Sequence, residues 1–209
     1  MTTPPARHFE SAAKQAHAAR LGMWVFLGSE LLLFAGLFAL YGAYRAADPA
    51  AFHLGIASAT KWLGSLNTCI LLVSSALAAL AVEAGRRGRR GRAVLLLLST
   101  MVCGGAFLFI KLTEYAEHFR EGIRPGGVGH FFVAHPERGL ATFWTLYYAS
   151  TGLHAIHVCV GIAVLGVTAF KLLVDGVDAE RLHPLENAAL YWHLIDVVWI
   201  FLWPLFYLS

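Results

Sequence analysis

The sequence predicts an all-α integral membrane protein, a bundle of five transmembrane helices. Of its 209 residues, 58% are hydrophobic and only 14% are charged, whereas a soluble domain carries about 25% charged residues. The mean hydropathy is +0.62, and the chain contains five apolar runs, each long enough to cross about 30 Å of hydrocarbon as a helix. Helices are expected because an open strand would leave backbone polar groups without partners in lipid.

An N-terminal segment, residues 1–20, precedes the first run. The expected spans cover residues 21–44, 62–82, 93–112, 141–174 and 187–208. The first span is too long for the apolar core of a signal peptide, contains Glu30 and precedes no small-residue cleavage site. We therefore expect it to be a transmembrane helix. The fourth span exceeds about 20 residues, so it must tilt or project from the bilayer.

Basic residues between the spans predict an N-in, C-out orientation with residues 1–20 in the cytoplasm. With that orientation the inside segments hold ten Lys and Arg residues. Five of the ten form the loop R-R-G-R-R-G-R, residues 86–92, which is short, adjacent to two spans and hard to translocate. The outside segments hold six basic residues: Arg45, Lys61, Lys111, Arg120, Arg124 and Arg138.

The net charge of +3 is mild, and the basic residues cluster between apolar runs. This pattern is typical of juxtamembrane anchoring, and it predicts no nucleic-acid partner. The three cysteines, Cys69, Cys103 and Cys159, lie inside apolar runs without a C-x-x-C pair. We interpret them as small buried hydrophobic residues.

Five ionisable residues lie well inside the predicted spans, where a charge costs at least about 2.5–3.5 kcal/mol. Each should therefore face protein or water, and each is a functional candidate. His154 and His157 are three residues apart in the fourth span, and His193 and Asp196 are three apart in the fifth. Each pair is expected to share a helix face. The fifth residue is Glu30.

Glu30 has apolar turns on both sides, in V-F-L-G-S-E-L-L-L-F. Loss of solvent favours the protonated carboxyl group there, and a neutral carboxyl can donate a hydrogen bond to a neighbouring helix. Two interpretations stay open. Glu30 is either a protonatable group beside a proton or oxygen path, or one partner of a satisfied hydrogen bond between helices.

Histidine and carboxylate ligands on facing helices can also build haem or di-iron sites. A di-iron bundle needs Glu-x-x-His pairs on two helices, and no span holds such a pair. His154 and His193 are expected at different depths, which disfavours a haem with two axial histidines. We therefore predict no metal site and interpret the histidines as polar contacts between helices. Glu114 and Glu117, at the outer end of the third span, are expected to be interfacial and partly solvated.

Five motifs, taken in order, resemble those of subunit III of the haem–copper oxidases, and they cover nearly the whole chain. In the first, Glu30 falls on the glutamate that this family carries within the membrane. The motifs are G-M-W-V-F-L-G-S-E-L-L-L-F (22–34), L-N-T-C-I-L-L-V-S-S (66–75), K-L-T-E-Y (111–115), T-G-L-H-A-I-H-V-C-V-G (151–161) and Y-W-H-L-I-D-V-V-W (191–199).

The resemblance implies an accessory subunit of a respiratory terminal oxidase, a multi-pass protein of the bacterial inner membrane. Such a complex reduces oxygen to water and translocates protons. The family has no redox centre of its own. It packs against catalytic subunit I and lies beside subunit II, and a small subunit IV is a further candidate partner. Haem and copper are held by these partner subunits. Phospholipid is implied between the helices of the family.

The resemblance also assigns roles to residues, none of them catalytic. Glu30 is implied as the site of carbodiimide labelling and as a support for proton uptake. The other polar residues are implied to be structural or to contact lipid: His154, His157, His193, Asp196 and Glu114.

The longest members of the family have seven spans, and the two that precede the glutamate helix have no counterpart here. Five-span members serve cytochrome c oxidases, quinol oxidases and nitric oxide reductase, and these alternatives stay open. An alternative of another class is an independent membrane b-type cytochrome or di-iron enzyme, in which the isolated chain would carry its own Soret band or metal.

Overall fold

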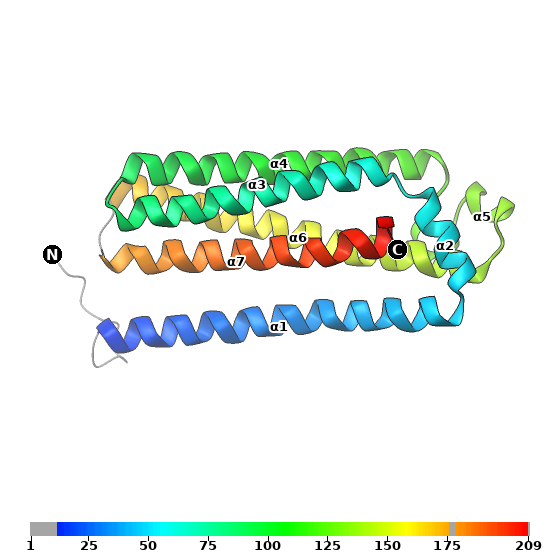
Figure 1. Ribbon diagram of the computed structural model, residues 1–209, viewed down its shortest axis with the longest axis horizontal. Coiled ribbons are helices and arrows are strands. Elements are labelled where there is room, and N and C mark those ends of the chain that lie inside the picture. Colours follow the sequence, from blue (N-terminus) through cyan, green and yellow to red (C-terminus); the bar gives the residue numbers. More distant parts are fainter. Residues whose placement is uncertain (1–11, 176–178, 209) are drawn as a thin grey trace.

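The computed structural model describes residues 12–175 and 179–208, and all the regular secondary structure in these residues is helical, without a strand. Five of the helices are long, and they run side by side along one axis (Figure 1). They are α1 (Ala12–Ala47), α3 (Lys61–Arg86), α4 (Arg90–Arg120), α6 (Arg138–Asp175) and α7 (Ala179–Trp203). Each contains a segment long and apolar enough to cross a membrane. The predicted all-α fold with five spans is confirmed.

The long helices extend beyond the predicted spans. The helix α1 already includes residues 12–20, which the sequence placed in the N-terminal segment. Residues 1–11 of that segment lie outside the described residues, as does Ser209. The helix α4 continues for eight residues past the predicted end of its span at Leu112. Because of this extension, Glu114 lies within α4, and its side chain is buried in the bundle.

Short helices gather at one end of the bundle (Figure 1). They are α2 (Pro49–Ser58), the 3-10 turn η1 (Pro125–Gly127) and α5 (His130–Ala134). Asp48 caps α2 by accepting a hydrogen bond from the Ala51 amide at 3.2 Å, and Pro49 suits the first helical position because it lacks an amide hydrogen. At the opposite end, residues 87–89 join α3 to α4 through Gly88, whose φ of 68° favours glycine.

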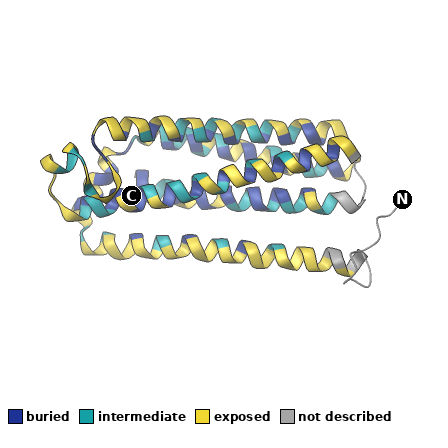
Figure 2. Ribbon diagram, turned by 180° about the vertical axis from the view of Figure 1, so that it is seen from behind, coloured by how far each residue is buried: buried dark blue, intermediate teal, exposed yellow. Residues whose placement is uncertain are grey.

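The helix α7 forms the centre of the bundle, whereas α1 lies on its flank. Half of the residues in the most apolar window of α7 are buried, compared with 11% in α1. Within the described chain, α1 packs mainly against α6 and α7, and most of its surface is exposed (Figure 2). The helix α1 therefore offers a broad apolar surface to lipid or to a partner.

Trp192 of α7 packs against three neighbouring helices, α3, α4 and α6. Its indole nitrogen donates to the Ser74 hydroxyl of α3 at 3.0 Å. A Cβ atom added at Gly104 of α4 would lie 2.6 Å from the Trp192 ring, and one at Gly161 of α6 would lie 2.9 Å from it. The two glycines thus leave room for the ring, as small residues do at helix interfaces in membranes.

The interpretation of the cysteines as buried residues is wrong for two of the three. Cys69 and Cys159 are exposed on the outer faces of α3 and α6, and Cys103 is half-buried. An apolar run does not distinguish a residue that faces the bundle from one that faces lipid, because both environments accept a small apolar side chain.

Candidate functional site

Glu30 of α1 pairs with His157 of α6. The Glu30 Oε2 atom lies 2.8 Å from His157 Nε2, and only 19% and 12% of the two side chains are exposed. The other ring nitrogen, Nδ1, lies 2.8 Å from the Leu153 carbonyl oxygen. A carbonyl oxygen can only accept a hydrogen bond, so Nδ1 carries a hydrogen. Nε2 and the carboxyl group then share the remaining proton between them.

This assignment of hydrogens leaves two forms of the pair: a carboxylic acid beside a neutral imidazole, or a carboxylate beside an imidazolium. Both forms have no net charge. The pair therefore avoids much of the cost of a lone charge at this depth. It also holds one transferable proton between α1 and α6, near the exposed flank of the bundle.

His154, three residues before His157, faces a different environment. It is fully buried, and its ring lies 5.4 Å from the ring of Phe107 and 5.2 Å from that of Trp199. Neither ring nitrogen has a hydrogen-bond partner in the described part of the chain. The ring of Phe34 lies 5.2 Å from that of His157 and 6.4 Å from that of His154, so one aromatic side chain contacts both histidines.

His193 and Asp196 of α7 also differ in their contacts. His193 Nδ1 lies 2.8 Å from the Ser75 hydroxyl of α3. Asp196 is buried. The Ser75 side chain lies near the Asp196 carboxyl group. Within the described residues, however, neither carboxyl oxygen of Asp196 has a hydrogen-bond partner. Of the five ionisable residues singled out in the spans, Glu30 and His157 are thus paired with each other, whereas His154, His193 and Asp196 have other surroundings. Among the residues that the structure describes, no three His, Cys, Asp or Glu side chains are grouped to hold a metal ion.

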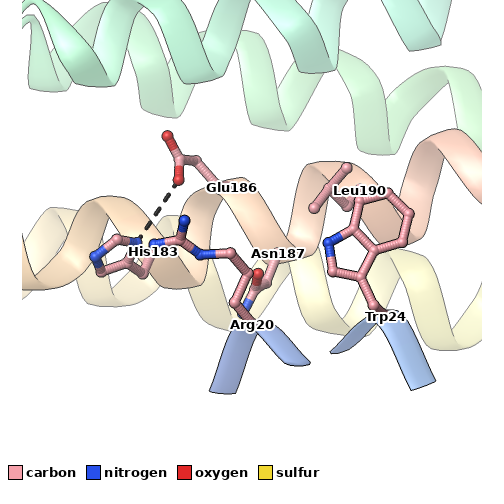
Figure 3. Close-up of a pocket in the computed structure, with 6 residues that line it drawn as sticks. All are labelled: Arg20, Trp24, His183, Glu186, Asn187 and Leu190. Atoms are coloured by element: carbon pink, nitrogen blue, oxygen red, sulfur yellow. Dashed lines mark ion pairs between the residues drawn. The ribbon is translucent and has the colours of Figure 1, made fainter. Parts of the chain in front are cut away.

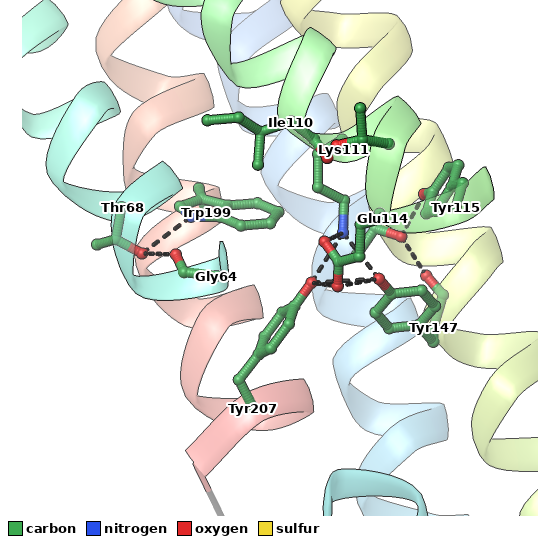
Figure 4. A network of polar contacts seen from close by, with 11 residues as sticks. Gly64, Thr68, Ile110, Lys111, Glu114, Tyr115, Tyr147, Trp199 and Tyr207 are labelled. Atoms are coloured by element: carbon green, nitrogen blue, oxygen red, sulfur yellow. Dashed lines mark hydrogen bonds and ion pairs between the residues drawn. The ribbon is translucent and has the colours of Figure 1, made fainter. Parts of the chain in front are cut away.

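A second polar site, buried near the end of the bundle that carries α2, was not predicted from the sequence (Figure 4). Lys111 Nζ lies 3.0 Å from Glu114 Oε2, 2.9 Å from the Tyr147 hydroxyl and 2.8 Å from the Tyr207 hydroxyl. These contacts match the three donors of an ammonium group. Glu114 Oε1 accepts from both tyrosines at 2.7 Å. We call these four residues the lysine–glutamate cluster.

The lysine–glutamate cluster joins three segments that are distant in the chain. Lys111 and Glu114 come from α4, Tyr147 from α6, and Tyr207 from the π-helix η2 (Pro204–Leu208). Pro204 lacks an amide hydrogen, so the α-helical hydrogen bonding of α7 does not continue unchanged beyond Trp203. The Tyr207 ring packs over Gly64 of α3, where an added Cβ would approach it to 2.9 Å.

Two sequence expectations are corrected here. Glu114 is not interfacial and partly solvated but fully buried, and Lys111 is not a basic residue of the outside segments but 1% exposed. The two charges tolerate burial because they neutralise each other and every donor of the lysine is bonded. The sequence signal was present: opposite charges three residues apart share a helix face.

Comparison with known proteins supports the resemblance. Residues 7–209 match the sequence profile of the family described as cytochrome c oxidase subunit III. The cytochrome c oxidase subunit 3 of Alkalihalophilus pseudofirmus is 30% identical over 206 residues, which cover 96% of this chain and 91% of the relative. The subunit of the same name from Bacillus sp. strain PS3 is 29% identical, with 99% and 93% covered.

The quinol oxidase subunit 3 of Bacillus subtilis is 28% identical over 191 residues, with 90% of this chain and 85% of the relative covered. Relatives of both oxidase types thus align over almost the full chain. The protein therefore belongs to the cytochrome c oxidase subunit III family of the haem–copper oxidases, the family that its five motifs predicted.

Proposed function

We propose that this protein is the non-catalytic subunit III of a terminal oxidase in a bacterial inner membrane. In this proposal a catalytic subunit I reduces oxygen to water and translocates protons, with subunit II beside it and a small subunit IV as a further candidate. The observation that carries the proposal is the family match over residues 7–209, together with relatives named as subunit 3 of cytochrome c and quinol oxidases.

The contacts of His157 and His193 support a structural role for these two residues in this subunit. His157 already bonds Glu30 and the Leu153 carbonyl oxygen, and His193 already bonds Ser75. Because both ring nitrogens of His157 are occupied, binding of a metal by His157 would require the loss of one of these two bonds. In the proposal haem and copper therefore belong to the partner subunits, and this chain contributes packing surfaces, lipid contacts and the Glu30–His157 pair.

Glu30 is the residue proposed to support proton uptake or oxygen delivery in the partner. It lies on α1, the flanking helix, and its side chain keeps some exposure. A partner or lipid packed against α1 would complete the surroundings of the pair. Transfer of the proton within the pair leaves the pair neutral, and its donation to a neighbouring group leaves one negative charge until a second proton is taken up.

A tagged copy of the chain, extracted from native membranes in mild detergent, is expected to co-purify with a multispan haem protein. The measurement is the visible spectrum and the protein composition of the purified sample, with untagged membranes as the control. A chain that is purified alone and folded would contradict the accessory assignment. A Soret band from the isolated chain would favour the b-type cytochrome instead.

The loop between α3 and α4 is expected in the cytoplasm and the C-terminus on the opposite side. The arginines of this loop lie at the end of the bundle where α1 begins (Figure 1). Burial of Lys111 removes one of the six basic residues counted outside, which strengthens the charge asymmetry behind the prediction. Alkaline phosphatase fused after Arg90 should be inactive, and the same enzyme fused through a linker after Ser209 should be active. An active fusion at Arg90 would contradict this orientation.

A further inference from the structure

Three polar side chains of α3 and α7 connect the interior of the bundle with its surface near the middle of the spans. Asp196 is 3% exposed, and neither of its carboxyl oxygens has a hydrogen-bond partner within the described residues. The Ser75 side chain lies near this carboxyl group, and the Ser75 hydroxyl lies 2.8 Å from Nδ1 of the half-buried His193. A carboxyl group, a hydroxyl group and an imidazole ring therefore lead from the interior outward, in that order.

The Nε2 atom of His193 is the outer end of this series. It makes no hydrogen bond within residues 12–175 and 179–208. Leu72 lies about one turn from Ser75 on α3, and Val197 about one turn from His193 on α7, and they are 50% and 44% exposed. A polar ring nitrogen on such an apolar surface is costly within a membrane unless water or a partner group bonds it. Nε2 is thus the atom at which the series meets its surroundings.

The series is isolated from other charges. Residues 62–82 of α3 and 93–110 of α4 contain no Asp, Glu, Lys, Arg or His. On α6, His154 lies among aromatic rings and His157 bonds Glu30 of α1. The buried ammonium group of the lysine–glutamate cluster already has three partners. A proton is therefore the simplest group that can neutralise the buried carboxylate of the series.

A cavity of about 190 Å³ lies next to α7, toward the end of the bundle where α1 begins. It is lined by Arg20 and Trp24 of α1 and by His183, Glu186, Asn187 and Leu190 of α7 (Figure 3). The volume far exceeds the roughly 10–15 Å³ that a single water needs on the same measure, and the polar side chains of the lining can bond water. The cavity is thus suited to bring water into the bundle from the end that we expect in the cytoplasm.

The cavity and His193 lie on the same face of α7. Glu186 and His193 are seven residues apart, a spacing that returns to the same face of a helix. Both contact α3, because Glu186 accepts a hydrogen bond from Arg86 at 2.8 Å and His193 bonds Ser75. Leu190 of the cavity precedes His193 by three residues, a rise of about 4.5 Å. Water in the cavity can therefore approach Nε2 from that end of the bundle.

We propose that Asp196, Ser75 and His193 form a proton-loading site, which stores one proton within the bundle and exchanges it through His193 Nε2 with water of the cavity. The inference deepens the support of proton uptake included in the proposed function, on which it rests. It adds a second exchangeable proton to that of the Glu30–His157 pair, and it adds proton transfer to the structural role of His193.

Loading of the site balances in protons and charge. It starts from a carboxylate and a neutral imidazole that carries its hydrogen on Nδ1. A proton from water binds Nε2. Nδ1 then passes its hydrogen to the Ser75 oxygen, while Ser75 passes its own hydrogen to the carboxylate. The product is a carboxylic acid beside a neutral imidazole with its hydrogen on Nε2. One proton has entered, and one negative charge has been neutralised.

The first test follows the proton on Asp196 in the whole oxidase complex by infrared difference spectroscopy. After transfer into heavy water, the carbonyl band of a protonated carboxyl group shifts as its hydrogen exchanges. Asp196→Asn should remove one such band from the wild-type spectrum, and Glu30→Gln should remove a different one. Absence of any band that depends on Asp196, at every pH at which the complex is stable, would overturn the proposal.

The second test measures how fast the Asp196 band exchanges. His193→Gln keeps a polar group beside Ser75 but cannot take up a proton, and Ser75→Ala removes the hydroxyl group. Each should slow exchange on the order of 100-fold, since a positioned acid–base group contributes about that much. Ser75→Thr keeps the hydroxyl group and should exchange like the wild type. Ser65→Ala is the matched control, because Ser65 bonds the Lys61 carbonyl oxygen of its own helix. Wild-type exchange in His193→Gln or Ser75→Ala would overturn the proposal.

The third test concerns the source of the proton. Leu190 lies between the cavity and His193, so Leu190→Trp should place a ring in the path of water and slow exchange of the Asp196 band. Leu190→Ala keeps the path open and should exchange at least as fast as the wild type. Equal rates in both variants and the wild type would overturn the cavity as the source.

Failure of this inference is distinguishable from failure of the proposed function. If the wild-type chain co-purifies with a haem-containing subunit but exchange does not depend on His193, only the proton-loading site is wrong. If the wild-type chain itself does not co-purify with a haem protein, the accessory function is wrong, whatever proton Asp196 exchanges.

Discussion

Replacing Lys111 by methionine is expected to destabilise the folded subunit by about 3–5 kcal/mol, the cost of removing one partner of a buried ion pair. The substitution leaves the Glu114 carboxyl group fully buried without the ammonium that lies 3.0 Å from it. It also removes the shared donor of Tyr147 and Tyr207. The contact that joins α4, α6 and the C-terminal π-helix is weakened as a result.

The thermal unfolding temperature of the purified complex and the amount of subunit per haem measure this effect. Lys61→Met is the matched control, because Lys61 is an exposed lysine at the same end of the bundle, and such surface changes usually stay within about 0.5 kcal/mol. The double variant Lys111→Met with Glu114→Gln should recover much of the loss, because it leaves no buried charge unpaired. Wild-type stability of Lys111→Met alone would show that the ion pair does not hold these helices together.

A hydrophobic carbodiimide is expected to label Glu30 in the assembled complex, and Glu30→Gln should abolish that label. Carbodiimides react with protonated carboxyl groups, and the proton shared with His157 makes such a form available. Glu114 is fully enclosed and bonded to Lys111, so it should react much less. Peptide mapping of the labelled chain by mass spectrometry measures which residue carries the adduct.

The same variant separates an accessory role from a catalytic one. Glutamine keeps the shape and can donate an amide hydrogen to His157 Nε2, so assembly should survive and oxygen reduction should fall only partly. Proton translocation, or the lifetime of the enzyme during turnover, should suffer more than the initial rate. Glu30→Ala removes the partner of His157 and should also weaken assembly. Complete loss of oxygen reduction by Glu30→Gln, in a complex that keeps its haems, would place Glu30 on an obligatory route and contradict the non-catalytic assignment.

The sequence by itself determined the fold class and the family of this protein. Apolar runs of membrane length admit few structures other than helices, because backbone polar groups find no partners in lipid. Five motifs in order were enough to identify the family. The sequence also singled out Glu30, His154, His157, His193 and Asp196, because ionisable groups are costly at those depths.

Only the tertiary structure decided which side chains meet. His154 and His157 are three residues apart, yet one lies among aromatic rings and the other bonds a glutamate of α1. The hydropathy pattern predicted that the third span ends at Leu112. In the structure, Lys111 and Glu114 on either side of that position are buried in the bundle. A hydropathy window sums the transfer free energies of residues along one helix. It contains no information on a hydrogen-bond or ion-pair partner that another helix supplies. The rotation of each helix about its axis, set by the packing of all five, decides whether a polar residue is exposed, paired or buried without a partner.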